Sequence, residues 1–297
     1  MRAACYPPDG LKPLQIKKIS TQHPTESAWD RLVRLVASVW PDDGQVNCIG
    51  VAAPGPTDPF QGVLFEAPNI PAWVNVPLAS LLQERFGVPV TMGNDANLAA
   101  LGEWKYGAGK GHHHLVYLTV STGIGSGIIV DDRLLLGTRG LAAELGHITV
   151  LPDGPMCGCG QKGHLEALAS GPSIARWVTE QITDGVPSSL SRLTVVTTKL
   201  VAEAAKSGDI LALQAINRAG TFVGQALADV LHIFNPTIVI IGGGVSQSGE
   251  LLMDPIRTAM QRHVMNTHYL DNLILTTAAL GDDTGLLGAL AMVRHQS

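Results

Sequence analysis

Residues 144–166 read ELGHITVLPDGPMCGCGQKGHLE. Three residues that bind soft or borderline metals, Cys157, Cys159 and His164, fall within eight positions of this stretch, and glycines lie between them. Zinc in proteins takes four such ligands in a tetrahedron, and His147 is the nearest candidate for the fourth. On spacing alone two interpretations remain open, a zinc site and a pair of free thiols in a loop.

The composition of the whole chain is that of a folded domain pair. The 297 residues carry 20 basic and 25 acidic side chains, a net charge of −5, with 45% apolar and 15% charged residues. This balance excludes disorder, and the lack of a basic run argues against a nucleic-acid surface. No apolar run has the roughly 18 residues of a membrane span, and no signal pattern begins the chain. We expect a cytoplasmic protein that does not contact nucleic acid or membrane.

Around the decisive stretch, apolar strands end in glycine-rich or polar loops and amphipathic helices follow them. The pattern predicts strands over residues 47–53, 88–92, 115–120, 128–130, 134–136, 237–241 and 273–276. It predicts helices over residues 76–86, 96–106, 213–234 and 284–294. The coarse class is therefore α/β in two lobes, with the first lobe ending near residue 105.

Two glycine-rich loops come directly after predicted strands. The run from Gly123 to Gly127 leads into another strand, which makes it a hairpin turn, and the strand after Gly242-Gly243-Gly244 ends without a carboxylate for a ribose. A dinucleotide fingerprint needs a following helix and that acidic residue, so NAD is disfavoured at both loops. Each loop alone could be a tight turn or an anion cradle. Two such loops together favour a nucleotide.

Four polar side chains flank glycines: Asp95, Glu144, His147 and Glu166. Asn94 and Asp95 precede a helix, so they could serve only as helix caps. A site for a polyhydroxy substrate would use the same groups, because carboxylates and amides bind sugar hydroxyls and one carboxylate can take a proton. The sequence leaves both interpretations open.

Taken together, these stretches resemble the motifs of the ROK family of sugar kinases and sugar-responsive repressors. Residues 144–147 match the family's E-x-G-H motif, and residues 157–166 match its C-x-C-G-x-x-G-C-x-E motif, except that His164 replaces the third cysteine. Three more stretches are similar to the segment of the catalytic aspartate, the second phosphate loop and the adenosine loop: GNDAN at 93–97, STGIGSG at 121–127 and IIGGGV at 240–245. The similarity covers nearly the whole chain in order.

The resemblance implies an actin/hexokinase-like fold, an α/β fold of two lobes around a central cleft. The smaller lobe would comprise residues 1–105 and the larger one residues 106–297, with the final helix packing back on the first lobe. It also implies ATP with Mg²⁺, a hexose, most often glucose, that is phosphorylated at its 6-hydroxyl, and a homo-oligomer, either a dimer or a tetramer.

The resemblance also assigns roles to residues. Asp95 would be the general base. The sugar would be bound by Asn94, Glu144, His147, Glu166 and, from the less closely matching stretch 68–73, Asn69. The nucleotide would be bound by Thr122, Gly123, Gly125, Gly242, Gly243 and Gly244. Structural zinc would be bound by His147, Cys157, Cys159 and His164, an ordinary Cys2His2 set despite the substituted cysteine.

Two family features are not found in the sequence. The kinases begin with a strand that ends in a D-x-G-G-T phosphate loop, whereas residues 1–5, MRAAC, resemble the segment that comes after that loop. The repressors carry an N-terminal helix-turn-helix, so the DNA-binding branch is disfavoured. Two hypotheses remain, a hexose kinase and a non-catalytic sugar-binding relic of one. We expect the reading frame before Met1 to encode the missing loop, and the 297 residues alone to be a weak kinase or none.

Overall fold

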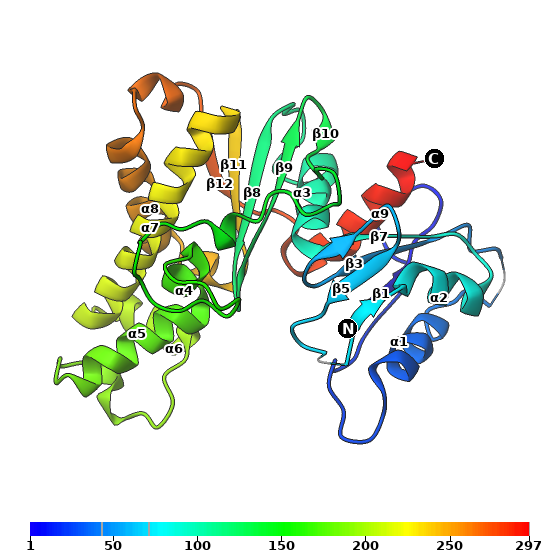
Figure 1. Ribbon diagram of the computed structural model, residues 1–297, viewed down its shortest axis with the longest axis horizontal. Coiled ribbons are helices and arrows are strands. Elements are labelled where there is room, and N and C mark those ends of the chain that lie inside the picture. Colours follow the sequence, from blue (N-terminus) through cyan, green and yellow to red (C-terminus); the bar gives the residue numbers. More distant parts are fainter. Residues whose placement is uncertain (43, 71, 297) are drawn as a thin grey trace. The chain divides into compact units, whose positions relative to one another are not determined.

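The computed structural model describes residues 1–42, 44–70 and 72–296, and the chain forms two compact units (Figure 1). Unit 2 comprises Gly111–Arg133 and Glu144–Ala278. Unit 1 comprises the chain up to Lys110, the segment Leu134–Ala143 and the C-terminal stretch from Ala279. The C-terminal stretch, which contains the last helix, is thus part of the same unit as the N-terminal residues.

Unit 2 is built on one five-stranded sheet, in the order β10-β9-β8-β11-β12. Its strands are β8 (Leu115–Val120), β9 (Ile124–Val130), β10 (Arg133–Leu134), β11 (Ile238–Gly242) and β12 (Ile274–Thr277). The central strand β11 is parallel to β8 and β12, and β9 pairs antiparallel with β8. Nearly all residues of β8 and β11 are buried, because parallel strands are covered on both faces.

The helices of unit 2 are α4 (Leu165–Ala169), α5 (Gly171–Thr183), α6 (Thr198–Lys206), α7 (Ile210–Phe234) and α8 (Glu250–His263). The longest, α7, begins at the N-cap Asp209, which accepts a hydrogen bond from the backbone N–H of Ala212. It ends at Asn235, whose positive φ of 43° stops the helix. None of the helices within the described ranges is long and apolar enough to cross a membrane.

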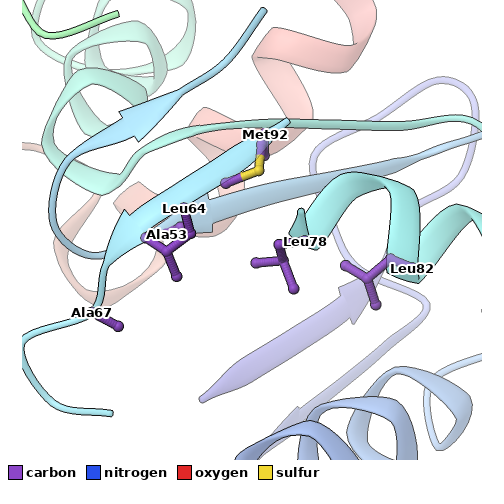
Figure 2. Packing of buried hydrophobic residues seen from close by; sticks show 6 residues of the cluster. All are labelled: Ala53, Leu64, Ala67, Leu78, Leu82 and Met92. Carbon is purple, nitrogen blue, oxygen red and sulfur yellow. The ribbon is translucent and has the colours of Figure 1, made fainter. Parts of the chain in front are cut away.

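Within the described residues, unit 1 holds three small sheets and four α-helices. The strands are β1 (Arg2–Cys5), β2 (Gln15–Lys18), β3 (Ile49–Ala53), β4 (Thr57–Asp58), β5 (Val63–Glu66), β6 (Val74–Val76) and β7 (Val90–Asn94). The helices are α1 (Ala28–Ala37), α2 (Leu78–Phe86), α3 (Asp95–Tyr106) and α9 (Thr284–Gln296). Figure 2 shows the core between strands and α2, where Leu78 and Leu82 of the helix and Leu64 and Met92 of the strands are almost fully buried.

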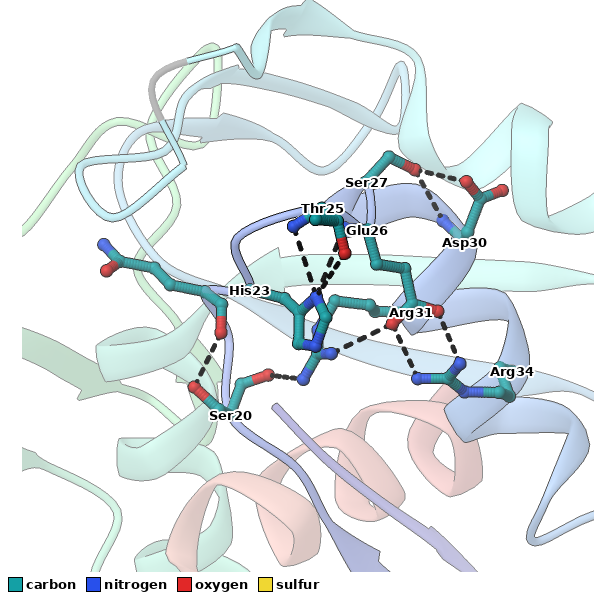
Figure 3. Close-up of polar contacts among 9 residues, drawn as sticks. Ser20, His23, Thr25, Glu26, Ser27, Asp30, Arg31 and Arg34 are labelled. Atoms are coloured by element: carbon teal, nitrogen blue, oxygen red, sulfur yellow. Dashed lines mark hydrogen bonds and ion pairs between the residues drawn. The ribbon is translucent and has the colours of Figure 1, made fainter.

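Helix α1 is fixed by a polar network at its start (Figure 3). The Ser27 hydroxyl accepts the Asp30 backbone N–H at 3.1 Å and donates to the Asp30 carboxylate at 2.7 Å. The Glu26 carboxylate bridges Arg34 and the buried Arg31. These contacts satisfy the free end of the helix and hold it against β1 and the core.

Helices α3 and α9 cross with their backbones in contact. A side chain at Gly102 of α3 would lie 2.9 Å from the Gly288 nitrogen and 3.0 Å from the Thr284 carbonyl oxygen. A side chain at Gly288 of α9 would overlap the Leu98 carbonyl of α3. Because both crossing positions are glycine, α9 can support the helix that begins with Asp95.

Two local predictions were wrong. No loop separates β7 from α3, because Asn94 ends the strand and caps the helix at once. The turn after β8 is also shorter than the predicted 121–127, since β9 begins at Ile124 and Gly125 and Gly127 pair with Thr119 and Tyr117 inside the sheet. In both cases pairing with a neighbouring strand extends β7 and β9 beyond the predicted bounds, and the local sequence does not contain that neighbour.

Candidate active site

Asn94 and Asp95 lie at the junction of β7 and α3. The Asn94 side-chain oxygen accepts the backbone N–H groups of Ala96 at 2.9 Å and Asn97 at 3.1 Å, and its nitrogen donates to the Gly55 carbonyl at 3.0 Å. Asn94 is therefore a helix cap, as one interpretation of the sequence held. Asp95 is the first residue of the helix, so its carboxylate lies at the positive end of the helix dipole.

Asp95 is open to solvent at one side and crowded by protein at the others. Its residue surface is exposed, yet the surrounding atoms remove part of its hydration, and this burial raises the pKa of the Asp95 carboxyl above the usual 3.8. Hydrogen bonds from the backbone N–H groups of Ala96 and Asp95 act in the opposite direction and are the smaller effect. An accessible carboxyl group with a raised pKa is suited to accept a proton from a hydroxyl.

Asn69 is also in unit 1, in an exposed turn after β5. The Ile70 backbone N–H donates to the Ala67 carbonyl at 2.9 Å and closes this turn. Pro71, in the middle of the stretch 68–73, lies outside the described residues. The structure thus presents Asn69 to solvent, and its contact with a sugar stays a prediction.

The first glycine loop stands at the end of β8, at the edge of the sheet where β11 also ends. Gly242 of β11 lies opposite Thr119 of β8, so the two loops are neighbours. The Ser121 N–H closes the turn on the Gly123 carbonyl at 2.9 Å. Within the described ranges, the backbone N–H groups of Thr122 and Gly123 have no protein acceptor. Backbone donors at the carboxyl end of a parallel strand are typical of an anion site.

The three glycines at the end of β11, Gly242 to Gly244, differ in their surroundings. A side chain at Gly242 would overlap the Tyr117 ring, and Gly243 has a φ of +85° and lies against the Val120 carbonyl. Gly244 is exposed, and in the described part of the chain no atom lies within 4 Å of the place of its missing side chain. The fold therefore requires the first two glycines, and Gly244 alone leaves open space beside the backbone for a ligand.

Residues 144–147 are fixed against β9. The short helix η1 (Leu145–His147) lies on this strand, and the Leu145 N–H donates to the buried Ser126 hydroxyl at 3.1 Å. A side chain at Gly146 would overlap the Ile124 carbonyl, so only glycine allows this approach. Glu144 precedes η1 and is exposed, and His147 ends it.

Glu166, in the first turn of α4, connects the first glycine loop with the cysteines. One carboxylate oxygen accepts the Ile124 N–H at 2.8 Å, and the other lies 3.7 Å from the Cys157 sulfur. The carboxylate also occupies the space where a side chain at Gly123 would be. The segment 157–166 therefore positions the start of β9 through this one side chain.

The predicted zinc ligands come together. The ligand atoms of His147, Cys157, Cys159 and His164 all lie within 4.8 Å of one another. The Cys157 sulfur is 3.8 Å from His147 Nδ1, and the Cys159 sulfur is 3.2 Å from His164 Nδ1. Ligands on a tetrahedral zinc ion are about 3.3–3.8 Å apart, given Zn–S and Zn–N bonds of about 2.3 and 2.0 Å. The donor set and its spacing fit zinc with no open position for a substrate.

Burial works against an ionised thiol in this cluster. Burial is the main cause that raises the pKa of Cys157 to about 11. A hydrogen bond from the Cys159 backbone lowers this pKa, whereas the Cys159 side chain and the Glu166 carboxylate raise it. A divalent cation would offset this effect, because metals bind the thiolate form. The chemistry of the cluster is therefore that of a metal site more than that of a reactive cysteine.

Sequence reasoning missed an open cavity of about 630 Å³ in unit 2. Lys206, Gln214, Asn217, Arg218, Ser248 and Leu251 contribute to its lining. Ser248 is the last residue of η3 (Gly244–Ser248), so the cavity adjoins the segment that begins with Gly244. The one available signal was the spacing of Gln214 and Asn217, which share a face of α7.

The ends of β8 and β11 in unit 2 thus bring Thr122 and Gly123 close to the glycines 242–244. Glu166 connects the first of these loops with Cys157. Residues 9–296 match the model of the ROK family. A glucokinase of Thermotoga maritima is 38% identical over 288 residues, 95% of this chain and 90% of the glucokinase. A xylose repressor of Caldicellulosiruptor bescii is 36% identical over 249 residues, 82% of this chain and 62% of the repressor.

A solved structure shows the same fold. The crystal structure of a ROK family glucokinase from Streptomyces griseus, in complex with glucose and AMPPNP, superposes with a TM-score of 0.83 at 35% identity. The match covers 96% of this chain and 93% of that one. The actin/hexokinase-like α/β fold expected from the sequence is confirmed, and the chain belongs to the ROK family.

Proposed function

We propose that this chain is a hexose kinase of glucokinase type, which transfers the γ-phosphoryl group of ATP to the 6-hydroxyl of glucose. The observation that carries the proposal is the pair of neighbouring loops at the ends of β8 and β11, with free N–H donors at Thr122 and Gly123 and open space at Gly244. The similarity to glucokinases, one of them crystallised with glucose and AMPPNP, supports the choice of substrates.

On the sugar side, Asp95 accepts the proton of the hydroxyl as its oxygen attacks phosphorus. Burial raises the pKa of the Asp95 carboxyl, which makes the carboxylate a stronger base for this proton transfer. Hydroxyl groups of the sugar are bound by Asn69, Asn94, Glu144, His147 and Glu166. Asn94 has its oxygen engaged in the helix cap, so it offers the sugar its second amide hydrogen.

On the nucleotide side, Thr122 and Gly123 donate backbone N–H groups to phosphate oxygens. Gly125 has no side chain and so leaves space for the nucleotide at the start of β9. Gly242 and Gly243 shape the loop, and Gly244 lies against the adenosine, whose base reaches toward the cavity beside η3. ATP brings Mg²⁺, which neutralises phosphate charge. Phosphoryl transfer is catalysed mainly by such positioning and charge stabilisation.

We propose a structural zinc ion for the cluster of His147, Cys157, Cys159 and His164. Its role is to fix the segment 144–166, so that Glu144 and Glu166 keep their positions relative to β9. His147 would then bind zinc through one ring nitrogen and a sugar hydroxyl through the other, since imidazole has two.

A coupled kinase assay tests the proposal over glucose, mannose, fructose and N-acetylmannosamine. Sugar-dependent ADP release, even at a low rate, is the expected result, with glucose preferred. The alternative, a sugar-binding relic, predicts that calorimetry detects glucose binding while no ADP forms. ATP consumption without sugar serves as the blank. A homo-oligomer and a cytoplasmic location also remain predictions.

A further inference from the structure

Glu103 is a charged residue that the proposed reaction does not use and that is completely buried. Its exposed fraction is 0%, the lowest of the charged residues in the described core. It lies in the last turn of α3, where the negative end of the helix dipole disfavours a carboxylate. A charge in such a place requires compensation by hydrogen bonds.

Three backbone N–H groups provide this compensation. One carboxylate oxygen accepts the backbone N–H of Ala108 at 2.9 Å and that of Ala279 at 3.1 Å. The other oxygen accepts the backbone N–H of Leu280 at 2.9 Å. The carboxylate lies so close to Gly107 that any side chain there would overlap it. Residues separated by more than 170 positions in the sequence are thus joined by a single side chain.

These partners stand where the chain passes between the two units. The first stretch of unit 1 ends at Lys110, two residues after Ala108, and the chain re-enters unit 1 at Ala279. From Leu280 the chain leads through η5 (Gly281–Asp283) into α9, which crosses α3 at Gly102 and Gly288. The Glu103 carboxylate therefore attaches two segments to the helix that begins with Asp95: the one by which the chain leaves unit 1, at Ala108, and the one by which it returns, at Ala279.

We propose that Glu103 is a positioning residue: it anchors two of the connections between the units to α3, and so sets where Asp95 stands for the reaction. This inference rests on the proposed kinase function for its activity readout only. A small displacement of a reacting group can lower turnover about 100-fold without a comparable loss of binding.

Glu103→Gln tests the proposal, because the amide nitrogen cannot accept an N–H. The glutamine oxygen can still accept, so only the amides on the replaced oxygen lose their acceptor: hydrogen exchange should become about 100-fold faster either at Leu280 or at both Ala108 and Ala279. At a temperature well below unfolding, kcat should fall about tenfold or more, while the KM for glucose stays within about threefold. Asp283→Asn is the matched control: this carboxylate is half-exposed, belongs to the same connection and pairs with Arg2. It should leave exchange and kcat nearly unchanged.

The outcomes separate the possible failures. Unchanged exchange at the three amides in Glu103→Gln would overturn the anchoring role. Faster exchange with wild-type kcat would show that Glu103 only stabilises the fold, and would overturn the positioning role. If the wild-type chain phosphorylates no hexose, the proposed function fails, whereas exchange measured with and without glucose still reports whether Glu103 holds both connections. Should Glu103→Gln fold poorly, Gly107→Ala, which displaces the carboxylate without removing it, must show the same exchange pattern.

Discussion

The carboxylate of Asp95 has a position that no other acidic side chain of the candidate site shares, at the first residue of a helix whose cap is the preceding asparagine. If it is the general base, Asp95→Asn should lower turnover about 10²–10⁴-fold and leave glucose affinity within several-fold. Steady-state kinetics and calorimetry measure the two effects. Glu84→Gln, an exposed change on α2, is the control. A variant that keeps a tenth of wild-type turnover would remove Asp95 from this role.

The same residue predicts a pH dependence of stability. Because the folded-state pKa of Asp95 is raised, the folded protein binds the proton more tightly than the unfolded chain does. The favourable contribution is complete below the usual pKa of 3.8 and is lost as the pH rises through the folded-state value. At pH 7, Asp95→Asn should therefore be at least as stable as the wild type. Urea denaturation from pH 4 to pH 7 should show the advantage of the variant growing with pH; a constant or shrinking difference contradicts it.

At the scale of elements, the crossing of α3 and α9 depends on two glycines. Gly288→Ala should destabilise the protein by about 1–3 kcal/mol, because its side chain would overlap the Leu98 carbonyl and force the helices apart. Gly285→Ala on the same helix meets no described atom within 4 Å and should be neutral or slightly stabilising. Urea denaturation of both variants measures the difference. Equal effects would mean that the close approach is not what holds α9.

The segment 144–166 is the second element with a measurable consequence. One zinc ion per chain is expected in protein purified without chelator, bound by His147, Cys157, Cys159 and His164. Chelation and the substitution Cys157→Ser should each lower both thermal stability and glucose affinity, because the free energy of metal binding then no longer stabilises the fold. Cys5→Ser, outside the cluster, should change neither. Metal analysis well below one zinc per chain would contradict the site.

The elements also show what sequence reasoning can reach. Apolar runs such as LVYLTV and IVIIG identify their strands because parallel, doubly covered strands need continuous apolar residues. The metal ligands are close in sequence, so spacing was enough to find them. Glu103 could not be found in this way, since its partners at Ala279 and Leu280 are distant in sequence and are backbone groups of ordinary residues. The hairpin of β1 and β2 was not predicted, and neither was helix α1, although its apolar and polar residues lie on opposite faces.

At the scale of the whole molecule, unit 1 differs from unit 2 in its sheets. In the described ranges β1 pairs with β2 alone and β3 with β7 alone, so β1 and β3 each have one open edge. All of β1 and most of β3 are only half-buried, whereas β8 and β11 are almost completely buried. Helix α9 contacts both open-edged strands. An open edge presents unpaired backbone donors and acceptors that a further strand can satisfy.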